Sequence, residues 1–118
     1  MNWREIETIR IDGMDYDLEF VDPGTQVKAD KLGAAYLDEL KIKLLIGNPR
    51  REIQTLWHEI IHVIDDNRLG YNLSETQTNT LGCSIYQVLA DNPDLLMAMY
   101  LSICGLEFEP ETDEEEDE

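Results

Sequence analysis

The chain has few positive charges: nine Lys and Arg residues stand against 26 Asp and Glu residues, and the formal net charge is −17. Binding to the phosphates of a nucleic acid depends on clustered Lys and Arg side chains. The scarcity of bases therefore argues against direct binding to nucleic acid. By charge complementarity, the acidic surface favours a basic protein as partner, such as a DNA-binding protein.

Much of the acidic excess lies at the C-terminus, where residues 107–118 contain nine acids and no base. The other 17 acids and nine bases give residues 1–106 a net charge of −8. A run of like charges repels itself and has little apolar surface to bury. We therefore predict a disordered acidic solubility tail over residues 107–118, behind a single domain over residues 1–106, a length typical of one domain.

Long apolar runs are also missing, since no stretch approaches the roughly 20 residues that a membrane-spanning helix needs. The opening residues Met1–Glu5 are too polar for a secretory signal. These features predict a cytoplasmic protein without a membrane partner. Cysteine is scarce too: Cys83 and Cys104 lack C-x-x-C spacing, and we expect both to be reduced core residues.

The first half of the chain carries the alternating pattern of β-strands. Residues 3–11 and 14–20 flank Asp12-Gly13, a dipeptide that favours a tight turn, and so predict a β-hairpin. A second extended pair is expected over residues 34–37 and 40–46. The lysines that alternate within the latter segment suit an edge strand or a solvated face.

The second half predicts three helices. The first begins at Asn48-Pro49 and runs to about residue 68. The second begins at Ser74 and has Leu81, Ile85 and Leu89 on its apolar face. The last covers residues 95–104. The order of the elements predicts an α+β domain. We expect a small, mostly antiparallel sheet of about four strands, packed on the first helix and followed by two further helices.

The two histidines of the chain, His58 and His62, frame an H-E-x-x-H sequence within the first predicted helix. Residues four apart lie on one face of a helix, so both imidazoles can reach one metal ion. This is the arrangement that tetrahedral Zn²⁺ takes from two of its ligands. Glu59 then lies beside the metal, where it can take a proton from a water molecule as general base.

A catalytic zinc usually takes three protein ligands, and no third histidine exists. The longer metalloprotease motif, with Gly and His after His62, is not met because Asp65 and Arg68 occupy those positions. The third ligand must then be a carboxylate or a thiolate. Glu75 is our candidate, because a short connection places the first turn of the next helix beside the first. Asp65 and its neighbour Asp66 remain alternatives.

The region from about residue 34 to 90 resembles the small gluzincin-like zinc metallopeptidases of the ImmA/IrrE type, which are common in phages and mobile elements. In that family the helix after H-E-x-x-H reads Glu-x-x-Ala-Asn-x-Phe-Ala, and here Glu75 and Asn79 match the Glu and the Asn. The Ala, Phe and Ala positions hold Thr78, Leu81 and Gly82. The resemblance implies a zincin-like fold, a zinc ion on His58, His62 and Glu75, and a DNA-binding repressor as substrate.

The combined features predict a zinc metalloendopeptidase that acts on a protein or peptide, with residues 40–46 holding the substrate as an added strand. The residue that assists the oxyanion is left open: Tyr36 and Tyr71 could each reach the cleft, but each is expected first to be an ordinary half-buried aromatic. One alternative is a catalytically inactive zincin-fold interaction module with a structural or residual metal. Another is a metal-dependent hydrolase that cleaves a non-peptide bond. The oligomeric state is left open.

Overall fold

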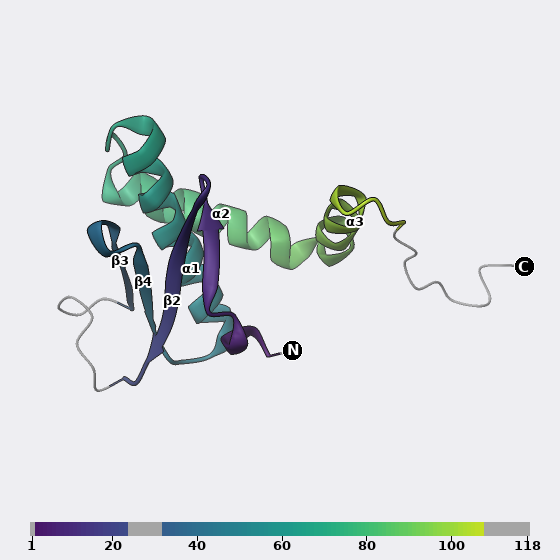
Figure 1. Ribbon diagram of the computed structural model, residues 1–118, viewed down its shortest axis with the longest axis horizontal. Coiled ribbons are helices and arrows are strands. Elements are labelled where there is room, and N and C mark those ends of the chain that lie inside the picture. The colour runs from purple at the N-terminus through teal and green to yellow at the C-terminus, as the bar shows by residue number, and fades with distance from the viewer. Residues whose placement is uncertain (1, 24–31, 108–118) are drawn as a thin grey trace, which may run out of the picture. The chain divides into compact units, whose positions relative to one another are not determined.

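A computed structural model describes residues 2–23 and 32–107 of the chain (Figure 1). The predicted acidic tail, apart from Glu107, lies outside these residues. The chain divides into two compact units, Met1–Tyr86 and Gln87–Glu118, and every candidate site residue belongs to the first. Within the described ranges, no helix combines the length and the apolar character needed to cross a bilayer.

The predicted β-hairpin is confirmed, with strands β1 (Thr8–Ile11) and β2 (Met14–Val21) paired antiparallel. Asp12 and Gly13 have φ angles of 52° and 83°, as a type I′ turn requires of both central residues. The prediction that the first strand begins at residue 3 is wrong. Trp3–Glu5 form a short 3₁₀ helix because Asn2 caps it through its side chain.

The sheet has four strands in the order β1-β2-β4-β3, with β3 at Gly33–Tyr36 and β4 at Lys41–Leu45. Two of its pairings are antiparallel and one, between β2 and β4, is parallel, so the predicted α+β class is confirmed with a mixed sheet. Because β4 has a neighbour on each side, the prediction that residues 40–46 receive a substrate strand is wrong. The edge strand beside it is β3.

The lysines of β4 lie on the solvated face of the sheet. Of the two predicted positions, an edge strand or a solvated face, the second is the correct one. Lys41 Nζ is 3.2 Å from a carboxylate oxygen of Glu19 on β2. Lys43 Nζ lies 5.4 Å from the centre of the Tyr36 ring. These contacts leave the opposite face of the sheet free to be apolar.

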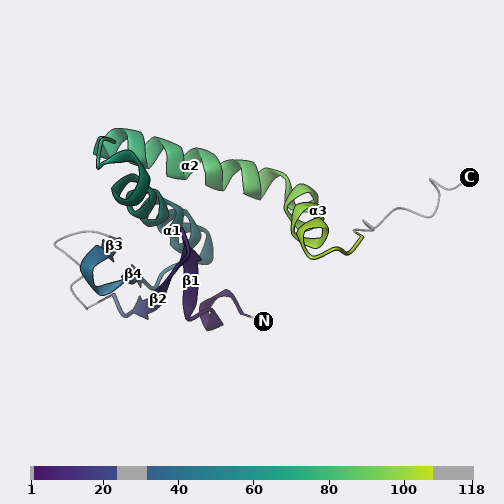
Figure 2. The same ribbon diagram turned by 45° about the horizontal axis from the view of Figure 1, so that its top comes forward.

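That apolar face is covered by helix α1 (Pro49–Ile64), which Figures 1 and 2 show lying along the sheet. The core consists of side chains that alternate along the strands and a stripe of the helix; its buried members are Ile11, Tyr16, Leu18, Ile42, Leu44, Leu56 and Val63. Burial of this apolar surface fixes which side of α1 faces the sheet and which side faces away from it.

The predicted helix from residue 49 to 68 is confirmed, although its last turn is wider than expected. The side chain of Asn48 accepts a hydrogen bond from Arg51 N, 2.9 Å, and caps the helix. Asp65–Leu69 continue it as a π-helical turn (η3), and Gly70 ends it with φ 71°. Arg68 in this turn contacts the carboxylate of Asp12 and so connects the helix end to the hairpin.

Helix α2 (Glu75–Asp91) begins with the predicted capping box. Ser74 N donates to Gln77 Oε1 over 2.8 Å, and Gln77 N donates to Ser74 Oγ over 3.0 Å. The predicted apolar face is wrong at Leu81, which is 42% exposed, whereas Thr78 and Gly82 are buried. Small residues face α1 because the two helices approach closely there.

The last helix, α3 (Pro93–Ile103), belongs to the second unit and ends before Gly105, whose φ is 79°. Cys104 is exposed at its C-terminus, so the prediction that it is a core residue is wrong. Cys83 on α2 is half-buried and accepts a hydrogen bond from Gln54 Nε2, 2.8 Å.

A buried carboxylate, Glu52, ties the N-terminus to α1. Its oxygens accept hydrogen bonds from Trp3 Nε1 (2.9 Å), Arg4 Nε (3.1 Å) and Gly47 N (2.7 Å), and only 1% of the residue is exposed. Burial opposes ionisation of this carboxyl, but the hydrogen bonds from Arg4, Gly47 and Trp3 outweigh that effect and lower its pKa.

Candidate metal centre

Three side chains that could hold a metal ion converge at the C-terminal half of α1. His58 and His62 lie one helical turn apart, and their Nε2 atoms are 3.2 Å from each other. Glu75, in the first turn of α2, places Oε2 2.9 Å from His58 Nε2 and Oε1 3.3 Å from His62 Nε2. Among the described residues, this is the group of three His, Cys, Asp or Glu side chains close enough to share one ion.

The geometry and chemistry of this group fit zinc. For a tetrahedral ion with metal–nitrogen and metal–oxygen distances near 2.0–2.1 Å, neighbouring ligand atoms lie roughly 3.3 Å apart. The two imidazole Nε2 atoms, 3.2 Å apart, match that value. Each of them is close to a different carboxylate oxygen of Glu75, and with one ligand atom taken from each residue the three atoms lie within 4.8 Å of one another. Two imidazoles and one carboxylate are also ligands that zinc accepts, and three of them leave the fourth position to a water molecule.

Gly82 explains how α2 comes near enough for Glu75 to reach the histidines. A Cβ atom at position 82 would lie 3.0 Å from both Cα and N of His58. The backbone of α2 therefore packs directly on the backbone of α1 at the first histidine. Glu75 lies about two turns earlier on α2, on the side that faces α1, and its carboxylate reaches both imidazoles.

The two alternative ligands, Asp65 and Asp66, are not in this group. Asp65 is completely buried, and its carboxylate accepts hydrogen bonds from Asn72 N (2.9 Å) and Leu73 N (3.2 Å). It therefore holds the connection between α1 and α2 and does not join the candidate ligand group. Asp66 is exposed, on the outside of the wide turn.

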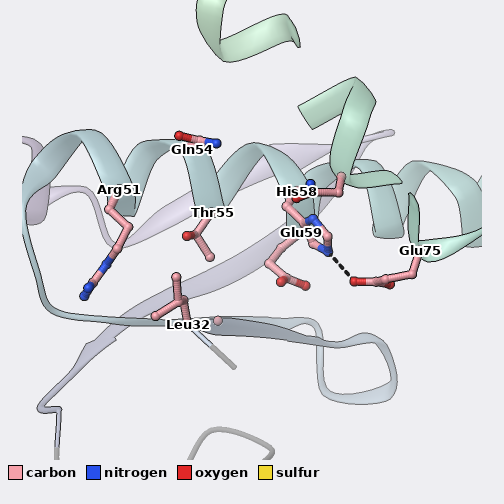
Figure 3. A pocket seen from close by; sticks show the side chains of 9 residues that line it. Leu32, Arg51, Gln54, Thr55, His58, Glu59 and Glu75 are labelled. Carbon is pink, nitrogen blue, oxygen red and sulfur yellow. Dashed lines mark ion pairs between the residues drawn. The ribbon is translucent and has the colours of Figure 1, made fainter. Parts of the chain in front are cut away.

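Glu59 is 5% exposed and lines two adjoining pockets that meet at the histidines and Glu75. The larger pocket has a volume of about 300 Å³ and runs along α1 towards Arg51 (Figure 3). The smaller has a volume of about 140 Å³ and is bordered by Tyr71. Both are also lined by Gly33 of the edge strand β3, so a cleft extends to both sides of the histidines.

The two tyrosines considered from the sequence take different positions. Tyr71 borders the smaller pocket together with Glu59, His62 and Glu75. Its φ angle is 64°, a left-handed conformation that is uncommon for a tyrosine, and its N–H donates to the carbonyl of Asp65 over 3.0 Å. Tyr36 borders neither of these two pockets. Tyr71 is therefore the tyrosine beside the candidate metal centre.

Sequence reasoning missed the residues that line the larger pocket away from the metal ligands. Arg51 and Thr55 project from α1, and Gly33 lies so near that a Cβ there would be 2.7 Å from Thr55 Cγ2. The sequence did contain a signal for Arg51 and Thr55, since helical spacing places positions 51, 55 and 58 on one face of α1. The position of Gly33 opposite them depends on the strand order, for which the sequence has no local signal.

Comparison of the chain with protein-family models, with characterised proteins and with solved structures finds no match. The resemblance to the ImmA/IrrE-type metallopeptidases thus remains a prediction drawn from the residues of the two helices.

Proposed function

We propose that the protein is a zinc-dependent metallopeptidase whose metal is held by His58, His62 and Glu75. The observation that supports this most strongly is the convergence of three ligand side chains from two different helices: the two Nε2 atoms are 3.2 Å apart, and each is within 3.3 Å of a carboxylate oxygen of Glu75. A zinc ion held there would lower the pKa of a bound water towards about 7 and polarise the carbonyl to be cleaved.

Glu59 is the general base in this proposal. It follows His58 directly on α1 and lines both pockets that meet at the ligands. Its carboxylate takes the proton of the water that attacks the peptide carbonyl, and the carboxylic acid then donates this proton to the leaving amine. Because Glu59 is 5% exposed, little bulk water competes with that transfer.

Tyr71 is the residue that we propose to assist the oxyanion. It borders the smaller pocket beside His62 and Glu75, and the buried Asp65 holds the backbone on either side of it. A phenol hydroxyl in such a position can donate a hydrogen bond to the oxygen on which charge develops.

A cleft on both sides of the ligands favours cleavage within a chain over removal of a terminal residue. A peptide in this cleft would lie beside β3, the edge strand, instead of beside β4 as the sequence suggested. The net charge of −17 favours a basic protein as substrate, and the resemblance suggests a DNA-binding repressor. The cytoplasm, where thiols stay reduced, suits the free Cys83 and Cys104.

The test is the variant Glu59→Gln, assayed on peptides from a digested proteome, with new N-termini identified by mass spectrometry. The expected result is a loss of turnover of about 100- to 10,000-fold with one equivalent of zinc retained. Glu7→Gln, an exposed position outside the site, is the matched control and should cleave as the wild type does.

The second candidate function is a binding module that keeps the metal without catalysis. It is favoured by the exposure of Glu75, whose side chain is 61% accessible, so that a partner protein could cover the centre. Absence of cleavage by wild-type protein with zinc bound would support this module over the peptidase, and cleavage that is equal in wild type and Glu59→Gln would show that Glu59 is not the general base.

A further inference from the structure

Among the described residues that line the larger pocket, Arg51 is the one Lys or Arg, and it lies at the end away from the proposed metal ligands. Figure 3 shows Arg51 at one end, Glu75 with His58 at the other, and Thr55 between them. Arg51 forms no ion pair with any carboxylate in residues 2–23 and 32–107, although the protein carries 26 acids. A guanidinium without a carboxylate partner in a ligand-sized pocket is suited to bind an anionic group.

The Arg51 side chain is held in place by backbone contacts. Its Nη2 donates to the carbonyl of Ile46 over 3.3 Å. The same guanidinium lies against Gly47: a Cβ atom at position 47 would be 1.9 Å from Nη2. A larger residue at position 47 would therefore displace the guanidinium of Arg51. One of the five N–H groups is thus used for anchoring, and the others remain for a ligand.

The distance between Arg51 and the metal ligands sets the length of the group that could bind both. Arg51 and His58 are seven residues apart on α1, which corresponds to roughly 10.5 Å along the helix axis. An extended peptide covers this length with about three residues. The overall acidity of the protein disfavours anionic groups elsewhere, so among the described lining residues Arg51 is the one that favours an acid.

We infer that Arg51 binds a carboxylate of the substrate about three residues from the bond to be cleaved, and that it determines specificity for an acidic group at that position. The inference rests on the proposed function, because it uses the metal centre as its reference point. The carboxylate can belong to an Asp or Glu side chain or to the C-terminus of a peptide.

The test uses four peptide hydroxamates, in which the hydroxamate binds the metal and a three-residue arm points towards Arg51. Three compounds end in an amide and carry Glu, Gln or Lys as the third residue; the fourth carries Gln and ends in a free carboxylate. Dissociation constants are measured by titration calorimetry on zinc-loaded protein, after metal analysis has established one zinc per chain. Tighter binding of the Glu compound or of the free carboxylate distinguishes the two sources of the acid.

The expected result for the wild type is binding of a carboxylate compound about tenfold tighter than the amide Gln compound. Arg51→Gln should abolish this preference and leave the affinity of the Gln compound within about twofold, because that compound makes no ion pair. Arg51→Glu should make the Lys compound the tightest. Arg50→Gln is the matched control, since Arg50 is the exposed neighbour of the same charge, and it should behave as the wild type does.

Equal binding of all four compounds to the zinc-loaded wild type would overturn the inference and leave the proposed function standing. Failure of all four to bind zinc-loaded protein would overturn the inference as well, because no peptide-like ligand would then occupy the pocket. Failure of the protein to hold zinc would instead overturn the proposed function, and metal analysis detects this before any compound is added.

Discussion

Gly82 lies directly on the backbone of His58, so that a Cβ atom at position 82 would be 3.0 Å from both His58 Cα and His58 N. This contact joins the helix that carries the H-E-x-x-H sequence to the helix that carries Glu75. The distance between the helices at this point decides whether the Glu75 carboxylate reaches both imidazoles. The position of the proposed third ligand thus depends on a residue without a side chain, seven positions further along α2.

Replacement of Gly82 by Val should separate the two helices and weaken zinc binding. The branched side chain has no room against His58, and overpacking of this kind costs about 1–3 kcal/mol of folding stability. We expect the zinc dissociation constant to rise at least about tenfold, measured by competition with a chromophoric chelator. Thr80→Val, at an exposed position of the same helix, should change neither quantity. Wild-type zinc affinity in Gly82→Val would contradict the role of this contact.

Glu75→Gln should weaken zinc binding and leave stability unchanged, whereas Asp65→Asn should lower stability and leave zinc binding intact. Glu75 is exposed, so its replacement should leave the free energy of unfolding within about 0.5 kcal/mol and weaken zinc binding by more than about 100-fold. Asp65 is buried and accepts backbone hydrogen bonds, so Asp65→Asn should lower stability by about 1–3 kcal/mol while the folded protein still binds one zinc. Urea denaturation and metal analysis measure the two effects. Loss of zinc from folded Asp65→Asn would instead identify Asp65 as a ligand.

Glu52 should make stability depend on pH in the acidic range. Its pKa is lower in the folded protein than the ordinary value of 4.5, so its contribution is complete above that value and is lost as the pH falls through the folded pKa. At pH 7 we expect Glu52→Gln to be less stable than the wild type by about 1–3 kcal/mol. Below about pH 4.5 this gap should narrow.

The measurement for Glu52 is urea denaturation at several pH values, with the difference between variant and wild type followed at each. Glu7→Gln, at an exposed position, should show no gap at any pH. A difference between Glu52→Gln and wild type that stays constant from pH 7 to pH 3 would mean that ionisation of Glu52 does not stabilise the fold.

Thr78 offers a substitution that should stabilise the protein. Its side chain is completely buried, and its Oγ1 is the buried side-chain polar atom without a hydrogen-bond partner among the described residues. Thr78→Val keeps the shape and removes the unsatisfied hydroxyl, so the free energy of unfolding should rise by about 1 kcal/mol. Thr80→Val again serves as the exposed control in the same denaturation series. Destabilisation by Thr78→Val would show that the hydroxyl is satisfied in solution.

Tyr71→Phe tests the proposed assistance to the oxyanion. Loss of one hydrogen-bond donor at the reacting oxygen should lower kcat by about 100- to 1,000-fold with little change in KM. Zinc content should be unchanged, because Tyr71 does not belong to the ligand group. Tyr36→Phe removes the same hydroxyl from a tyrosine that lines neither pocket at the metal centre and should keep full activity. Equal kcat in the two variants would remove Tyr71 from the mechanism.

Local interactions made part of this structure predictable from the sequence. The turn at Asp12-Gly13, the Asn48 cap and the Ser74–Gln77 capping box each involve residues within four positions of one another. The same holds for His58 and His62, which any regular helix brings together. The α+β class followed from the order of these elements.

Tertiary packing decided the rest, because the contacts involved join residues far apart in the chain. Pairing of β4 with β2 on one side and with β3 on the other placed residues 41–45 inside the sheet, where a substrate strand cannot be added, and left β3 at the edge. Burial turned Asp65 from a possible metal ligand into an acceptor for the connection that follows α1. The sequence alone determined the paired imidazoles, whereas the packing of Gly82 on α1 decided which carboxylate joins them, since no local rule sets the distance between two helices.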